Sequence, residues 1–256
     1  DCLRGNEQSN GCELELFVPT KEGNLDCTLC LDCVRACPHD NVHLAPTFPA
    51  SDVMHDQYRG SVGSLERKDY TALMIVIVFG AFANAAGMIA PVHRCIDSIS
   101  NWIGAPSPKL VTAMFILCSA FIVPSILCVL AKRVAATSYQ VAWSLVPLGI
   151  SMWAAHLLFH FFTSYQSLLP VTKRALYDVG LASQPETTWA LSNTPDWIIS
   201  FELFVLTCGF LATVALCLRL VNTYTERLPW IALSTILYIT GIWIVLQPMQ
   251  MRGMIA

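Results

Sequence analysis

The residues from Ile198 to Val221 read IISFELFVLTCGFLATVALCLRLV, with Glu202 and Arg219 as the only charged side chains. About 20 predominantly apolar residues in a helix are enough to cross the apolar core of a bilayer. Directly before the stretch, Thr194-Pro195-Asp196-Trp197 offers an N-cap, a proline for the first turn and an interfacial tryptophan. These features predict a transmembrane helix.

Four further segments have the same length and apolar character. The five predicted spans cover residues 70–92, 109–131, 139–163, 198–221 and 228–248. Leu228-Pro229-Trp230 repeats the proline–tryptophan pair and marks the expected start of the last span. We therefore predict an all-α integral membrane domain of about five transmembrane helices over residues 70–256.

The composition divides the chain into two parts. Of the 256 residues, 55% are hydrophobic and 13% are charged, whereas soluble domains carry about 25% charged residues. The charge deficit falls after Tyr70, while the first seventy residues hold six of the eleven cysteines. Residues 1–45 therefore predict a small soluble module and residues 46–69 a polar linker. The formal net charge of -3 gives no basis for nucleic-acid binding.

A run of four cysteines dominates the predicted module: Cys27-Thr-Leu-Cys30-Leu-Asp-Cys33-Val-Arg-Ala-Cys37-Pro38. The spacing C-x2-C-x2-C-x3-C-P is that of bacterial ferredoxins, which bind [4Fe–4S] clusters through these thiolates. We therefore predict a ferredoxin-like iron–sulfur module over residues 1–45. A zinc site is the alternative, because zinc also binds four thiolates, although zinc ribbons usually separate their two pairs widely.

The four cysteines of the run need not bind one cluster. In two-cluster ferredoxins the final Cys-Pro serves the neighbouring cluster, so we expect Cys27, Cys30 and Cys33 on one cluster and Cys37 on another. Cys2 and Cys12 are candidate extra ligands. We also expect the protein to continue upstream of Asp1, where a second motif could lie.

Several stretches resemble one family of membrane proteins. They are Asp1-Cys2-Leu3-Arg4-Gly5-Asn6-Glu7, Gly11-Cys12-Glu13-Leu14, Cys27 to Asn41, Phe79 to Met88 and Gln247 to Gly253. The chain is similar in them to membrane-bound iron–sulfur oxidoreductases of the FesM type, relatives of the polyferredoxins NapH, NosR and CcoG. The resemblance implies respiratory or quinone-linked electron transfer, or a redox role in maturing a metalloenzyme. A typical polyferredoxin has two adjacent ferredoxin runs, and this sequence has one.

Basic residues near the predicted spans bear on the orientation. The side of the module carries Arg67, Lys68, Lys132, Arg133, Arg219 and Arg227. The other side carries Arg94, Lys109, Lys173, Arg174 and Arg252. Since cytoplasmic loops are richer in Lys and Arg, this small excess predicts a multi-pass protein of the cell inner membrane with a cytoplasmic module.

A second group of polar residues falls on the far side of the membrane in this topology. It comprises His93, His156, His160, Glu202, Met249 and Met251. Ionisable residues inside a membrane are costly and are candidates for function. Imidazole and thioether ligands suit copper, a histidine with a carboxylate could bind and protonate a quinone, and one histidine could ligate haem b. The alternative is that the histidines make only interhelical hydrogen bonds.

These features lead to a functional hypothesis. We expect an electron-transfer protein that exchanges electrons between a soluble redox partner protein and a membrane acceptor, and an iron–sulfur oxidoreductase subunit is one form it could take. Two alternatives remain open. One is a metal-handling or maturation protein that reduces or delivers copper to a respiratory enzyme, and the other is an accessory subunit of a larger respiratory or photosynthetic complex. No catalytic residue is evident.

Overall fold

The computed structural model describes residues 1–21, 24, 26–44, 46, 68–104, 107–134, 139–183, 195–221 and 223–248. The chain divides into two compact units, Asp1–Ala72 and Leu73–Ala256.

The first twelve residues form a small hairpin in the N-terminal unit. Gly5 and Asn10 make an antiparallel bridge, and the Cys12 N–H donates to the Cys2 carbonyl oxygen at 3.3 Å. Gly5 has a φ of 81°, and a Cβ at Gly11 would lie 2.1 Å from the Leu3 carbonyl oxygen. Because these positions tolerate only glycine, the hairpin is tight, and the backbones of Cys2 and Cys12 are adjacent at its base.

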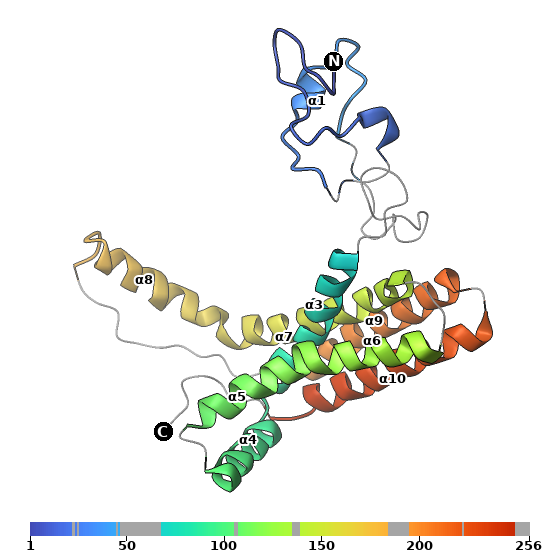
Figure 1. The fold of residues 1–256 in the computed structure, drawn as a ribbon. Coiled ribbons are helices and arrows are strands. Elements are labelled where there is room, and N and C mark those ends of the chain that lie inside the picture. The colour runs from blue at the N-terminus through green and yellow to red at the C-terminus, as the bar shows by residue number, and fades with distance from the viewer. Residues whose placement is uncertain are drawn as a thin grey trace. The chain divides into compact units, whose positions relative to one another are not determined.

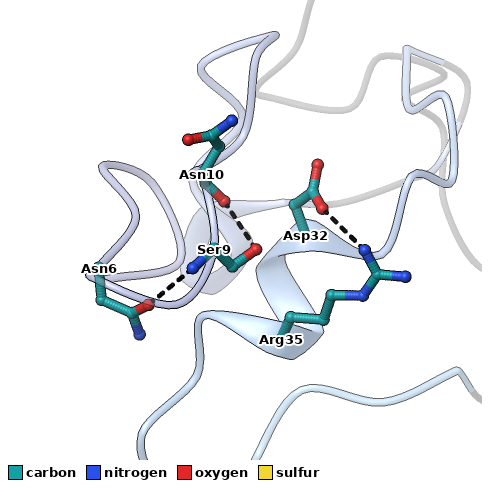
Figure 2. Close-up of polar contacts among 5 residues, drawn as sticks. All are labelled: Asn6, Ser9, Asn10, Asp32 and Arg35. Carbon is teal, nitrogen blue, oxygen red and sulfur yellow. Dashed lines mark hydrogen bonds and ion pairs between the residues drawn. The ribbon is translucent and has the colours of Figure 1, made fainter.

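Asn6 attaches this hairpin to the cysteine run. Its Oδ1 accepts hydrogen bonds from the backbone N–H groups of Gln8 and Ser9, at 2.9 and 3.1 Å, and the contact with Ser9 is drawn in Figure 2. Its Nδ2 donates to the Ala36 carbonyl oxygen at 3.1 Å. One side chain therefore both shapes the turn and connects residues 1–12 to the segment that carries Cys33 and Cys37.

Two short helices complete the described part of this unit, the 3-10 helix η1 (Val18–Thr20) and the helix α1 (Asp32–Arg35). Arg35 and Asp32 of α1 form an ion pair at 3.7 Å (Figure 2). Within the described residues of the unit there is an isolated bridge and no β-strand. The ferredoxin-like character of residues 1–45 therefore stays a prediction.

The rest of the described chain is helical (Figure 1). The elements are α3 (Lys68–Ala86), α4 (Ala90–Ile103), α5 (Pro108–Leu117), the π-helical segment η2 (Cys118–Ile122), α6 (Val123–Val134), the 3-10 helix η3 (Tyr139–Leu145), α7 (Val146–Ser164), the 3-10 helix η4 (Tyr165–Ser167), α8 (Leu168–Asp178), α9 (Ile198–Leu220) and α10 (Tyr224–Val245). Five helical stretches are long and apolar enough to cross a membrane: Asp69–Ala86, Pro108–Leu127, Val141–Asp178, Ile198–Leu220 and Tyr224–Val245. The prediction of five spans is confirmed.

The first span ends earlier than predicted. The sequence suggests a helix to residue 92, but α3 stops at Ala86 and a separate helix, α4, begins at Ala90. Gly87 interrupts the apolar run, and Pro91 lies in the first turn of α4, where its missing N–H costs little. The Ala90 N–H donates to the Pro248 carbonyl oxygen at 3.1 Å, which joins the start of α4 to the end of the last span.

The last span begins earlier than predicted. We expected its start at Leu228-Pro229, but α10 begins at Tyr224 and contains Pro229. Thr223 and Glu226 provide the reason, because the Thr223 hydroxyl donates to Glu226 Oε2 at 2.6 Å in a T-x-x-E sequence typical of helix starts. Arg227 Nε also donates to the Val221 carbonyl oxygen at 2.6 Å, which closes the turn between α9 and α10.

Helices α7 and α9 form the most extensive helix pair of the membrane unit. Gly209 of α9 allows their close approach, because a Cβ there would lie 2.1 Å from Ser151 Oγ and 2.8 Å from the Pro147 carbonyl oxygen. The Thr213 hydroxyl accepts the Leu148 backbone N–H at 3.1 Å. That donor belongs to the first turn of α7 and has no partner within its own helix.

The neighbouring helices approach this pair at two other glycines. A Cβ at Gly149 of α7 would lie 2.7 Å from Val78 of α3. A Cβ at Gly241 of α10 would lie 2.8 Å from Leu206 of α9. Glycine contacts therefore connect α3, α7, α9 and α10 into one bundle.

The Gly209 contact yields a stability prediction. Gly209→Ala should lower the free energy of unfolding by about 1–3 kcal/mol, because the new methyl group meets the Pro147 carbonyl. Gly80→Ala is the matched control on α3, since an added Cβ there meets nothing within 4 Å. The control should be neutral or stabilising by up to about 1 kcal/mol. Thermal unfolding of the purified proteins in detergent measures both, and equal effects would contradict the packing described here.

Candidate functional site

Four thiols line a single cavity in the N-terminal unit. The cavity has a volume of about 320 Å³, and its lining includes Cys12, Cys27, Cys30 and Cys33. Three of these cysteines come from the run, whereas Cys12 comes from the base of the hairpin. The remainder of the lining is mostly aliphatic and includes one cation, Lys21.

The loop between the thiols has an unusual backbone. Leu29 and Leu31, which separate Cys27, Cys30 and Cys33, have φ values of 56° and 67°. Left-handed conformations cost a residue with a side chain about 1–3 kcal/mol and are concentrated at functional sites. Here they turn the loop around the cavity, and the Leu29 N–H donates to Cys27 Sγ at 3.4 Å.

The thiols of the run differ in acidity. The Leu29 N–H, and to a lesser degree Lys21, lower the pKa of the Cys27 thiol. Burial raises the pKa of the Cys33 thiol. The site therefore stabilises a thiolate first at Cys27, which is the form in which cysteine binds metals.

Cys37 and Cys2 are not part of the cavity lining. Cys37 precedes a turn whose backbone N–H groups, those of Asn41 and His39 foremost, lower the pKa of its thiol. The amide groups after Cys37-Pro38 thus favour a second thiolate, apart from the first group. His39 contributes to this environment through its backbone.

No group of three or more His, Cys, Asp or Glu side chains in the described residues gathers to hold a metal ion. The four thiols line one cavity, but in the described residues they do not make such a group. Their chemistry nevertheless fits an iron–sulfur cluster, because all four are soft thiol ligands. Glu13 is the one carboxylate and His43 the one imidazole in the described lining.

A second polar group lies inside the membrane unit. His156 of α7 and Glu202 of α9 are 3% and 1% exposed. His156 Nδ1 and Glu202 Oε1 have no hydrogen-bond partner in the described structure. The ring of His160 meets that of His156 edge to face, with the centroids 4.6 Å apart.

The other far-side candidates are placed only in part. The bond between Ala90 and Pro248 brings the start of α4, with the partly exposed His93, to the end of α10. Met249 and Met251 lie outside the described residues. The described histidines and Glu202 do not form a three-ligand metal group.

Two contributors to these sites did not emerge from the sequence. Lys21 lines the thiol cavity, and Asn6 fixes the hairpin that brings Cys12 there. The sequence signal for Asn6 is its position in the Gly5-Asn6 pair, because such pairs favour tight turns. Lys21 has no comparable signal.

Comparisons of the chain with protein-family models, with curated proteins and with solved structures found no match. What the chain does is therefore inferred from its own residues and their arrangement.

The thiol environments predict a pH dependence for the metal-free chain. Alkylation requires the thiolate, so iodoacetamide should modify Cys27 with a lower pH midpoint than Cys33, because a lowered pKa brings the thiolate to lower pH. Lys21→Met should raise the midpoint of Cys27. Cys37 is the internal control, since backbone N–H groups lower its pKa. Peptide mass spectrometry after timed labelling gives each profile, and identical midpoints for Cys27 and Cys33 would contradict the prediction.

Proposed function

We propose that this chain is a membrane-bound iron–sulfur protein that passes electrons between a soluble redox partner and an acceptor in the membrane. The observation that carries the proposal is the cavity lined by Cys12, Cys27, Cys30 and Cys33. The same chain has five helices that are long and apolar enough to cross a membrane. A redox module joined to such a domain can deliver electrons to a quinone or to a cofactor of a partner subunit.

The four cavity cysteines would hold a [4Fe–4S] cluster as thiolates. When bound, the cluster supplies one-electron transfer at a potential set by hydrogen bonds to its sulfurs and by exposure to solvent. The Leu29 N–H is positioned to donate to sulfur at this site. Lys21 would offset part of the negative charge of the thiolates.

Cys37 would belong to a second site. It is absent from the cavity lining and has its own set of backbone N–H donors. In two-cluster ferredoxins, likewise, the last cysteine of the run binds the neighbouring cluster and not the one bound by the first three. The remaining ligands of a second cluster could include Cys2.

Zinc is the main competitor for the cavity. Zinc ribbons usually separate their two pairs of thiolates widely, whereas Cys27, Cys30 and Cys33 follow the C-x2-C-x2-C spacing of bacterial ferredoxins. This spacing favours an iron–sulfur cluster over a single zinc ion.

Copper handling has no comparable support. Its sequence basis includes Met249 and Met251, which lie outside the described residues, and the described histidines do not form a metal group. We therefore propose electron transfer alone, with the module on the cytoplasmic side of the cell inner membrane.

Cysteine variants test the proposed ligands. Cys12→Ser should abolish or alter the electron paramagnetic resonance (EPR) signal of the reduced cavity cluster, because it removes one of four ligands. Cys37→Ser should leave that signal in place. Cys118→Ser, in the membrane unit, is the matched control and should retain both the signal and the iron content. The opposite pattern, with loss in Cys37→Ser and no change in Cys12→Ser, would contradict this ligand set.

Electron delivery to the membrane requires a separate test. The full chain in lipid vesicles should show absorbance bleaching when its cluster is reduced, and a ubiquinone analogue should restore the absorbance. Cys30→Ser should show neither change, because it lacks a cluster ligand. A wild-type cluster that is reduced but not reoxidised by the quinone would rule out quinone as the direct acceptor.

A further inference from the structure

Helices α7 and α9, which pack against each other, each carry a buried polar atom without a partner. His156 Nδ1 and Glu202 Oε1 are enclosed by protein, and neither makes a hydrogen bond in the described structure. Leaving a buried polar atom unpaired costs about 1–3 kcal/mol, and more when the group is charged. Two such atoms on a pair of packed helices therefore need an explanation.

The packing of the two helices places these residues at one level. Three contacts define the register: Leu148 with Thr213, Ser151 with Gly209, and Phe162 with Trp197. In these antiparallel contacts the residue numbers of facing positions add up to about 360. Glu202 therefore faces the level of Leu158, between His156 and His160. At about 1.5 Å per residue, it is offset by about 3 Å along the axis from each histidine.

We propose that Glu202 and His156 form a proton-binding site inside the membrane unit. An isolated carboxylate in an apolar interior is costly, so Glu202 holds a proton unless a partner takes it. His156 Nδ1 is the complementary acceptor. A rotamer change would bring Glu202 Oε1 within hydrogen-bond distance of it, or a water molecule would link the two atoms. The inference does not depend on the iron–sulfur proposal.

The proton transfer needs no reactant other than these side chains. Glu202 gives its proton to His156 Nδ1, and the imidazole releases its Nε2 proton toward His160, whose ring is adjacent. His160 is only partly buried and connects the pair to the surface of the unit. Re-protonation of Glu202 by the reverse route restores the first state. The two histidines would thus load and unload a proton held by Glu202.

The remaining titratable and charged groups on the packed helices lie elsewhere. On α9, Arg219 is separated from Glu202 by 17 residues, about 25 Å. Helix α9 also contains the thiols of Cys208 and Cys217. The other groups lie in the first turns of two neighbouring helices: Tyr224, Glu226 and Arg227 in α10, and Asp69 and Tyr70 in α3. The Tyr238 hydroxyl of α10 is bonded to Thr207 at 2.9 Å. Tyr165 of η4 and His93 of α4 lie at the end of the bundle nearest His160.

Infrared spectroscopy of the full chain in lipid vesicles tests the site. The wild type should show, at neutral pH, the carbonyl-stretch band of a protonated carboxylic acid in dry surroundings, and carbon-13-labelled glutamate should shift it. Glu202→Gln should remove the band, whereas Glu226→Gln should leave it, because Glu226 is only partly buried and accepts a hydrogen bond from the Thr223 hydroxyl. His156→Phe should keep the band but slow its exchange in deuterated water by about 10²-fold or more, since it removes the proton relay.

Any of three results would overturn the proposal. The first is the absence of a glutamate-derived band in the wild type, a measurement that requires no variant to fold. The second is a band that survives in Glu202→Gln, and the third is an exchange rate that is unchanged in His156→Phe.

Discussion

The close contact of α7 and α9 at Gly209 is the constraint on which the membrane unit depends. A side chain at this position would collide with Ser151 and with the carbonyl of Pro147. The contact fixes the register of the two helices, and the register determines that Glu202 faces the turn between His156 and His160. In a membrane, where lipid is as apolar as the helices, such small-residue contacts are a main source of specific association.

The N-terminal unit depends on polar contacts of a different kind. A hydrogen bond contributes about 0.5–1.5 kcal/mol on average, so the three bonds of the Asn6 side chain are a substantial part of what holds so small a unit together. Two of them shape the turn of the hairpin, and the third connects the hairpin, with Cys12 at its base, to the end of the helix that follows Cys30. The cavity thus receives thiols from two separate segments, and its proposed function depends on that connection.

The sequence predicts the architecture better than it predicts the sites. Length and apolarity are sufficient to identify five spans, because the bilayer imposes both. They do not reveal α4, whose Arg94 and Asp97 break the apolar pattern, or the start of α10, where the hydrogen-bonded side chains of Thr223 and Glu226 come before Pro229. Helix ends depend on local hydrogen bonds that hydropathy does not measure.

The candidate sites show the same limit. Spacing identifies Cys27, Cys30 and Cys33 as a group, because a short loop brings them to one place. It cannot select Cys12 over Cys2, since that choice depends on how the hairpin folds. Likewise His156 and His160 are predictable neighbours at i and i+4, but their relation to Glu202 requires the register of two helices that are distant in sequence.

The central claim is that the cavity thiols hold a polynuclear iron–sulfur cluster. X-ray absorption spectroscopy of the purified full chain tests it most directly, because it identifies the metal and its neighbouring atoms together. We expect iron with a sulfur shell and a second shell of nearby iron atoms. Stoichiometric zinc with a sulfur shell, no metal neighbour and no iron would contradict the account.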